Sequence, residues 1–174
     1  MGMYPGGNVI RVTPTLSTSA YTAHDVLFDA TAIPNVVASR GGISKLINIT
    51  IHTDLTTDFD LDLVFMETQT NLGTINEDAG SGSLWTDALA RASKILGVVN
   101  FNMGNGIVDL VNNEIVTYTG NATGTDGEVF NQLPMLLKAE DGETSVYVAG
   151  MIRGAGPTFG ADDLQFIFHV EYLG

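Results

Sequence analysis

The chain has 174 residues, a length typical of one globular domain, and 44% of them are apolar, which favours a packed core over intrinsic disorder. Its 20 acidic residues outnumber its 7 lysines and arginines and give a net charge of −13, which argues against nucleic-acid and anionic membrane partners because both call for clustered positive charge. The chain has no cysteine, so disulfides, thiolate zinc sites and cysteine nucleophiles are excluded.

The first eight residues precede any predicted strand, so we expect an N-terminal arm over residues 1–8 and a single domain over residues 9–174. The arm lacks the basic and apolar regions of a secretory signal, and no apolar run in the chain approaches the ~20 residues of a membrane span. Tyr4 and Pro5 are candidate partner contacts, because such an arm can become ordered by lying on a partner. A frayed terminus is the alternative interpretation.

Alternation of apolar and polar residues, the pattern of half-buried strands, dominates the rest of the chain. It covers residues 47–51, 59–65 and 164–172, whereas residues 146–149 are apolar on both faces, as in a strand at mid-sheet. The side chains predicted to share the core faces of these strands are Ile47, Ile49, Ile51, Phe59, Leu61, Leu63, Phe65, Leu164, Phe166, Phe168, Val170 and Tyr172.

One segment, about residues 84–96, has helical periodicity instead. Its apolar residues recur at the spacing of one helical face, and they are Trp85, Ala88, Leu89, Ala92, Ile95 and Leu96. Ser83 suits the N-cap and Gly97 the position after the last turn. We therefore predict one short α-helix, with Trp85 on its apolar stripe as a core or partner-interface residue.

Turn dipeptides separate the predicted strands. Asn105-Gly106 and Asp141-Gly142 favour the positive φ angles of tight hairpin turns, and Asn112-Asn113 is a third candidate. Residues 120–127 are typical of an exposed loop. Many short strands with one helix predict a mainly β fold, namely an antiparallel β-sandwich with jelly-roll-like connections.

The densest acidic group is formed by Asp54, Asp58, Asp60 and Asp62. Asp58, Asp60 and Asp62 are candidate Ca²⁺ ligands, since this cation prefers several carboxylate oxygens. The EF-hand pattern fails, because Leu63 stands where that loop needs glycine and Gln69 where it needs glutamate. We favour a solvated outer strand face, on which like charges also discourage edge-to-edge aggregation.

Motifs of enzyme sites are missing from the sequence. It contains no glycine-rich phosphate-binding loop and no GxSxG serine motif, and His24, His52 and His169 are far apart in the chain. Glycosidases need only two carboxylates, but nothing singles out a pair among the acids. We therefore expect no catalysis and no cofactor.

A set of sequence blocks carries a resemblance to a known family. They are residues 12–21 (VTPTLSTSAY), 25–29 (DVLFD), 33–35 (IPN), 41–42 (GG), 95–99 (ILGVV), 136–139 (LLKA), 145–149 (SVYVA) and 153–154 (RG). In this order they resemble virion structural proteins of tailed bacteriophages that are associated with capsid decoration, or cementing. The blocks extend over most of the chain, from about Val9 to Leu173.

This resemblance implies a decoration protein on the outer surface of the capsid, with the major capsid protein as partner and a homo-oligomer, trimer or dimer, as the bound form. It implies no catalytic residues. One alternative is a tail, fibre or head-fibre component of the virion. Another is a carbohydrate-binding β-sandwich module, in which Tyr21, Trp85, Tyr118 and Tyr147 would have to converge.

Overall fold

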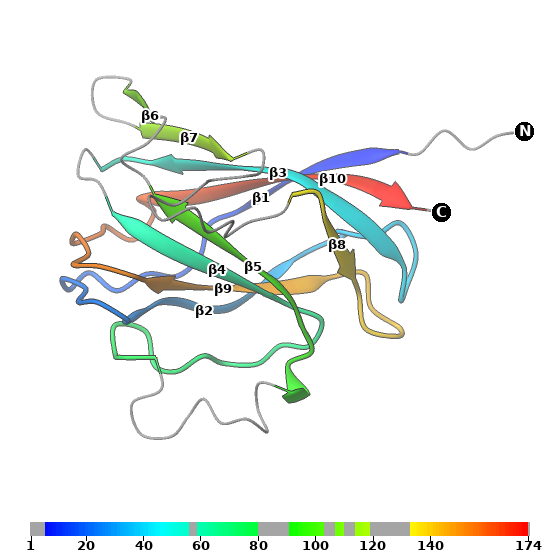
Figure 1. The fold of residues 1–174 in the computed structure, drawn as a ribbon, viewed down its shortest axis with the longest axis horizontal. Helices are drawn as coiled ribbons and strands as arrows, with labels where there is room; N and C mark the ends of the chain where they lie inside the picture. The colour runs from blue at the N-terminus through cyan, green and yellow to red at the C-terminus, as the bar shows by residue number, and fades with distance from the viewer. Residues whose placement is uncertain are drawn as a thin grey trace, which may run out of the picture.

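The computed structural model describes residues 6–55, 59–79, 91–102, 107–109, 114–118 and 133–173, and for 102, 107–109 and 114–118 it describes the backbone. Two antiparallel sheets face each other, as the sequence predicts (Figure 1). One sheet has the order β1 (Gly7–Val12), β10 (Leu164–Leu173), β3 (Ile43–Thr53), β7 (Glu114–Tyr118) and β6 (Ile107–Asp109), with β8 (Met135–Lys138) also paired to β3. The other has the order β2 (Val26–Ile33), β9 (Val146–Ile152), β4 (Asp60–Met66) and β5 (Ile95–Asn102).

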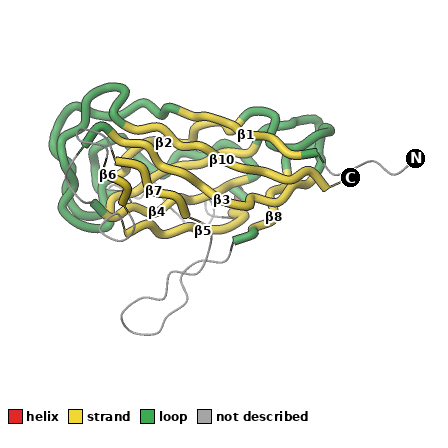
Figure 2. The backbone as a smooth tube through the Cα atoms, turned by 90° about the horizontal axis from the view of Figure 1, so that it is seen from above, coloured by secondary structure: helices red, strands yellow, loops and turns green. Residues whose placement is uncertain are grey.

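The strands of both sheets run along the long axis of the domain (Figure 2). They pair from the two ends of the chain inwards: β1 with β10, β2 with β9, β3 with β8 and β4 with β5. The remaining two strands, β6 and β7, pair with each other, and β7 extends the first sheet beside β3.

The strand pairing shows that two hairpins predicted from the sequence are wrong. The dipeptide Asn105-Gly106 lies between β5 and β6, and Asp141-Gly142 lies between β8 and β9, but in each case the two strands belong to different sheets. Gly142 does adopt a positive φ of 92°, so the local turn chemistry holds there. Turn residues favour a reversal of the chain direction. Which sheet the following strand joins depends instead on where that strand can bury its apolar side chains.

The core lies between the sheets and confirms most of the predicted alternation. Its aromatic centre includes Phe28 and Phe166, whose ring centroids are 5.3 Å apart, and Phe65 and Phe168, at 5.9 Å. Tyr172, near the end of β10, is half-buried at the rim. The predicted core residues that are buried are Ile49, Ile51, Phe59, Leu61, Leu63, Phe65, Leu164, Phe166, Phe168 and Val170.

The alternation predicts that Ile47 lies on the same face as Ile49, and this prediction is wrong. Leu46 is paired with Val170 and Asn48 with His169, so Ile47 is an extra residue in β3 opposite an uninterrupted β10. Such a β-bulge shifts the alternation by one. As a result Leu46 is fully buried and Ile47 is 39% exposed on the outer side of the sheet.

The helix predicted over residues 84–96 is wrong at its C-terminal end. Residues 80–90, with Trp85, lie outside the described residues; Arg91 and Ala92 are helical, and strand β5 begins at Ile95. Pairing of Phe65 with Gly97 and of Val64 with Val98 continues the second sheet through this segment. Within the described part of the chain, no helix has the length and apolar composition needed to cross a bilayer.

Part of the outer side of the second sheet is covered by the chain itself, whereas Ile95 and Val98 on β5 are each 43% exposed. Residues 67–79 follow β4 and run beneath β2 and β9 in the view of Figure 1. The side-chain amide of Gln69 donates to the carbonyl of Ala30 at 3.1 Å, and the backbone N–H of Val26 donates to the carbonyl of Glu77 at 2.9 Å. The small second core beneath this segment consists of Val26, Ala30, Val64, Met66, Leu72 and Ala149. β9 is therefore buried on both faces, as predicted for residues 146–149.

Candidate functional site

The candidate partner contacts of the sequence, Tyr4, Pro5 and Trp85, lie outside the described residues. Strand β1 begins at Gly7, so the last two residues of the predicted arm are paired with β10, Gly7 with Glu171 and Asn8 with Val170. These two residues therefore belong to the domain, and the predicted boundary between arm and domain at residues 8 and 9 is wrong by two residues.

Of the candidate Ca²⁺ ligands, Asp58 lies outside the described residues, and Asp60 and Asp62 stand on the outer side of β4. Asp62 departs from the expected solvated face, because it is buried and surrounded by protein groups. The side-chain amide of Asn100 donates to its Oδ1 at 2.6 Å, and Nε of Arg153 lies 3.0 Å from the same oxygen. Among the described residues, no group of three or more metal-ligating side chains comes together.

Burial raises the pKa of the Asp62 carboxyl, and the hydrogen bond from Asn100 and the guanidinium of Arg153 oppose this rise. The same guanidinium donates through Nη2 to the carbonyl of Phe101 at 2.8 Å. Arg153 therefore ties the end of β9 to both β4 and β5. This arrangement is a structural polar contact at the outer face of the second sheet. The sequence alternation could not reveal it, since Asn100 and Arg153 come from distant parts of the chain.

The four aromatic residues of the sugar-binding alternative do not form the expected platform. Tyr21 is buried in the core, where its hydroxyl accepts from the backbone N–H of Ser17 at 2.7 Å and donates to the carbonyl of Leu27 at 3.0 Å. Tyr147 packs against the small second core on the opposite side of β9. Trp85 and the side chain of Tyr118 lie outside what the structure describes. Because Tyr21 is sealed inside the domain, it cannot stack on a sugar.

The histidines also lie apart. His52 and His169 stand on β3 and β10 of the first sheet, and Nε2 of His52 is 3.9 Å from Oδ1 of Asp54. His24 precedes β2 of the second sheet and has a positive φ of 73°. Nothing in these positions brings the three imidazoles to one site.

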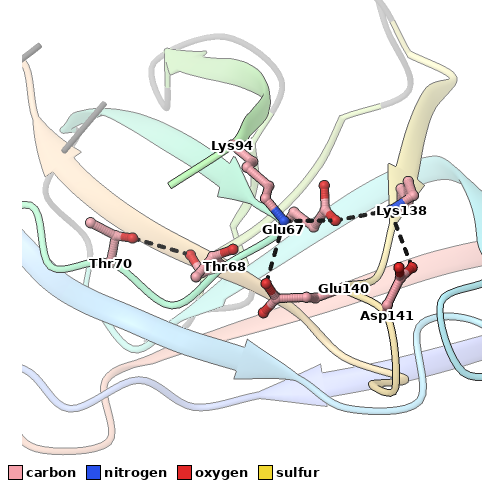
Figure 3. Close-up of polar contacts among 7 residues, drawn as sticks. All are labelled: Glu67, Thr68, Thr70, Lys94, Lys138, Glu140 and Asp141. Carbon is pink, nitrogen blue, oxygen red and sulfur yellow. Dashed lines mark hydrogen bonds and ion pairs between the residues drawn. The ribbon is translucent and has the colours of Figure 1, made fainter. Parts of the chain in front are cut away.

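A charged cluster that the sequence analysis did not identify joins the two sheets at one edge of the sandwich. It consists of Glu67, Lys94, Lys138, Glu140 and Asp141, and is called the Glu67 cluster here (Figure 3). Glu67 follows β4 and is buried, and its Oε1 lies 3.3 Å from Nζ of Lys94 and 2.9 Å from Nζ of Lys138. Lys94 also reaches Glu140 at 3.3 Å, and Lys138 lies 4.0 Å from Asp141.

The lysines determine the ionisation of the cluster. The hydrogen bond from Lys138 holds the pKa of Glu67 below its ordinary value, and Lys94 acts in the same direction, against the effect of burial. The main-chain carbonyl of Lys94 accepts from the N–H of Glu67 at 3.1 Å, so the backbone also fixes the pair. An ionised carboxylate that pairs with two ammonium groups is suited to stabilising the packing of the chain segments that carry these three groups. A proton-transfer group would need the opposite pKa displacement, towards neutrality.

The outer side of the first sheet is the other functional candidate. Its strands β1, β10, β3 and β8 leave four large apolar side chains exposed, namely Val9, Ile43, Ile47 and Leu136. A shallow hollow of about 340 Å³ lies among Val9, Ile47, Asn48 and His169. Small-molecule sites are usually deep clefts that enclose the ligand. The hollow is shallow, so this face is better suited to contact with a macromolecule.

No model of a known protein family matches the chain, and no curated protein is significantly similar to it.

Proposed function

We propose that this protein is a structural component of a tailed bacteriophage that binds the outer surface of the capsid and stabilises the shell. The observation that carries the proposal is the ordered set of sequence blocks resembling virion decoration proteins. In the structure, several of these blocks fall on strands of the sandwich: residues 25–29 at β2, 95–99 in β5, 136–139 at β8 and 145–149 at β9. The residues that carry the resemblance thus include parts of strands from both sheets.

The strand pairing supports this proposal. Pairing from the chain ends inwards is what results when one long antiparallel hairpin is rolled up into two sheets, and we infer that the sandwich is a jelly roll with β6 and β7 as an added hairpin. Jelly rolls occur in viral capsid and lectin domains. Because one architecture serves several functions, the fold is compatible with a virion role and does not define it.

The proposed action is mechanical and needs no catalytic group. A decoration protein adds buried contact between neighbouring copies of the major capsid protein, and a contact of standard size, about 1,600 Å², repeated over the shell would oppose the internal pressure of packaged DNA. A net charge of −13 suits a molecule that stays outside the shell and does not bind the packaged DNA.

The proposal is tested by adding the purified protein to particles of the encoding phage from which it has been removed. Binding should saturate at a stoichiometry set by the capsomers, and the temperature at which the particles release DNA should rise. Bovine serum albumin at equal concentration serves as the control for non-specific protection. Particles that bind none of the protein, or that release DNA at an unchanged temperature with the protein bound, would contradict a stabilising role.

A further inference from the structure

The connection between β8 and β9 carries an aspartate followed by a glycine, a pair that has no part in the proposed function. The backbone N–H of Glu143 donates to the carbonyl of Glu140 at 2.9 Å, so Asp141 and Gly142 are the two central residues of a β-turn. Gly142 has a φ of 92°, which is close to the value that a type II turn requires at this position and which glycine adopts without strain. The dipeptide therefore lies at the tip of a hydrogen-bonded turn.

The two groups of this dipeptide that can react with each other are both accessible. The side chain of Asp141 is 99% exposed, and its one ion-pair contact among the described residues, with Nζ of Lys138 at 4.0 Å, is as long as such contacts become. No described residue accepts a hydrogen bond from the backbone N–H of Gly142. A Cβ on Gly142 would meet no atom within 4 Å, so the tip is also open on that side.

The other described aspartates lack this combination, because Asp141 alone among them precedes a glycine. The carboxylate of Asp62 is buried and lies 3.0 Å from Nε of Arg153. In the pair Asp29-Ala30, the N–H of Ala30 donates to Oδ1 of Asp29 at 2.7 Å, so the nitrogen is already engaged. A side chain on the following residue also hinders attack of its amide nitrogen on the carboxyl group. Glycine leaves that nitrogen accessible.

We propose that Asp141 is a modification site, at which the folded protein converts aspartate to isoaspartate through a succinimide. The amide nitrogen of Gly142 attacks Cγ of Asp141. The N–Cγ bond forms, the bond from Cγ to the hydroxyl of the protonated carboxyl breaks, and this hydroxyl leaves with the amide proton as water. Water then adds to the main-chain carbonyl carbon of Asp141, whose bond to the nitrogen breaks. The chain now runs through Cγ, the former main-chain carbonyl is a free carboxyl group, and the elemental composition is unchanged.

The product changes a connection between the two sheets, because β8 belongs to the first sheet and β9 to the second. Isoaspartate adds one carbon to the main chain inside the turn that the hydrogen bond between Glu140 and Glu143 closes. The carbonyl of Glu143 also accepts from the N–H of Gly41 at 2.8 Å, so the altered turn adjoins the segment before β3. The new carboxyl group is exposed, and it is a substrate for methyltransferases that act on isoaspartyl residues with S-adenosylmethionine as the methyl donor.

Tryptic mapping of the full-length chain tests the proposal. Cleavage after Lys138 and Arg153 releases residues 139–153, in which Asp141 is the only aspartate and no asparagine occurs. Any isoaspartate in this peptide therefore comes from Asp141. The folded protein is kept for several weeks in mildly acidic buffer, in which part of a carboxyl population is protonated. A second form of the peptide, of equal mass, should accumulate. Electron-transfer fragmentation should identify it as isoaspartyl, and a purified isoaspartyl methyltransferase should methylate it.

Asp141→Glu is the matched variant, because glutamate keeps the exposed carboxylate but would have to close a larger ring, and it should abolish the product. Gly142→Ala should reduce the product, since the added methyl group shields the nitrogen. Far-UV circular dichroism and a thermal melt establish that each variant is folded. A sample of the wild-type chain unfolded in guanidinium chloride gives the reactivity of the dipeptide without the turn.

Isoaspartate that forms in the folded wild-type protein at no less than about a tenth of the unfolded rate, and that both variants diminish, would support the proposal. A slower reaction in the folded protein, or none, would show that the turn protects Asp141 and would overturn it. The proposal would equally be overturned by a product that persists in Asp141→Glu, or by one that Gly142→Ala leaves undiminished.

Discussion

Nζ of Lys138 on β8 lies 2.9 Å from Oε1 of Glu67, which follows β4 in the opposite sheet. The contact therefore joins the two layers of the sandwich at an edge where the backbone makes no ladder between them. Lys94 approaches the same oxygen from the segment that leads into β5. Three parts of the chain, far apart in sequence, are held by one buried carboxylate.

Glu67→Gln should destabilise the domain by about 1–2 kcal/mol at pH 7, since the amide keeps an acceptor but loses the charge that the two lysines stabilise. Because the folded-state pKa of Glu67 is below 4.5, its ordinary value, its stabilising effect is complete above that pH and is lost as the pH falls through the folded pKa. Urea unfolding of both proteins between pH 7 and pH 3 should therefore show a difference that shrinks on acidification.

Glu140→Gln is the matched control for that experiment. Its carboxylate also lies 3.3 Å from Lys94, but its side chain is 43% exposed, so the loss should stay below about 0.5–1 kcal/mol. Equal losses in the two variants, or a Glu67→Gln difference that grows on acidification, would contradict the assignment of Glu67 as the stabilising group of the cluster.

Phe166→Ala should lower the free energy of unfolding by about 3–5 kcal/mol, because the ring is fully buried against Phe28 and Phe168. Gln165→Ala, one residue earlier on the outer side of β10, should cost no more than about 0.5 kcal/mol. Chemical denaturation measures both. A loss under ~1 kcal/mol for Phe166→Ala would mean that β10 does not present this residue to the core.

Gly150→Ala should destabilise the domain by about 1–3 kcal/mol, since a Cβ at this position of β9 would meet the ring of Phe28. The reason is close packing of the ring on a bare backbone, and it does not involve a special φ angle. Gly154→Ala is the control, because a Cβ there would meet no atom within 4 Å. Thermal melts that rank the two variants equally would argue against this packing.

Under the proposed function, deleting residues 1–5 should weaken binding to the capsid. The fold should stay intact, since β1 starts at Gly7 and keeps its pairing with β10. The comparison is capsid occupancy of the shortened and full-length chains at equal concentration, with a thermal melt as the folding control. If the shortened chain occupies the capsid to the same extent as the full-length chain, residues 1–5 do not contribute to the proposed contact.

The sequence predicted the class of fold because alternation is a local property. Phe166, Phe168 and Val170 could be assigned to the core from their own strand. Ile47 could not, since a bulge depends on the register with β10, and the helix expected near Ile95 gave way to a strand because pairing with β4 outweighs local periodicity. Asp62 and Glu67 were missed as structural carboxylates, because their partners Arg153 and Lys138 are distant in the chain.

The proposed function is tested most directly by the number of copies of this chain, relative to the major capsid protein, in purified particles of the phage to which the proposal assigns it. The account predicts a ratio near one, or a simple fraction repeated over every capsomer. A handful of copies would contradict capsid decoration and indicate a tail or fibre component, and absence from the particles would contradict a virion role altogether.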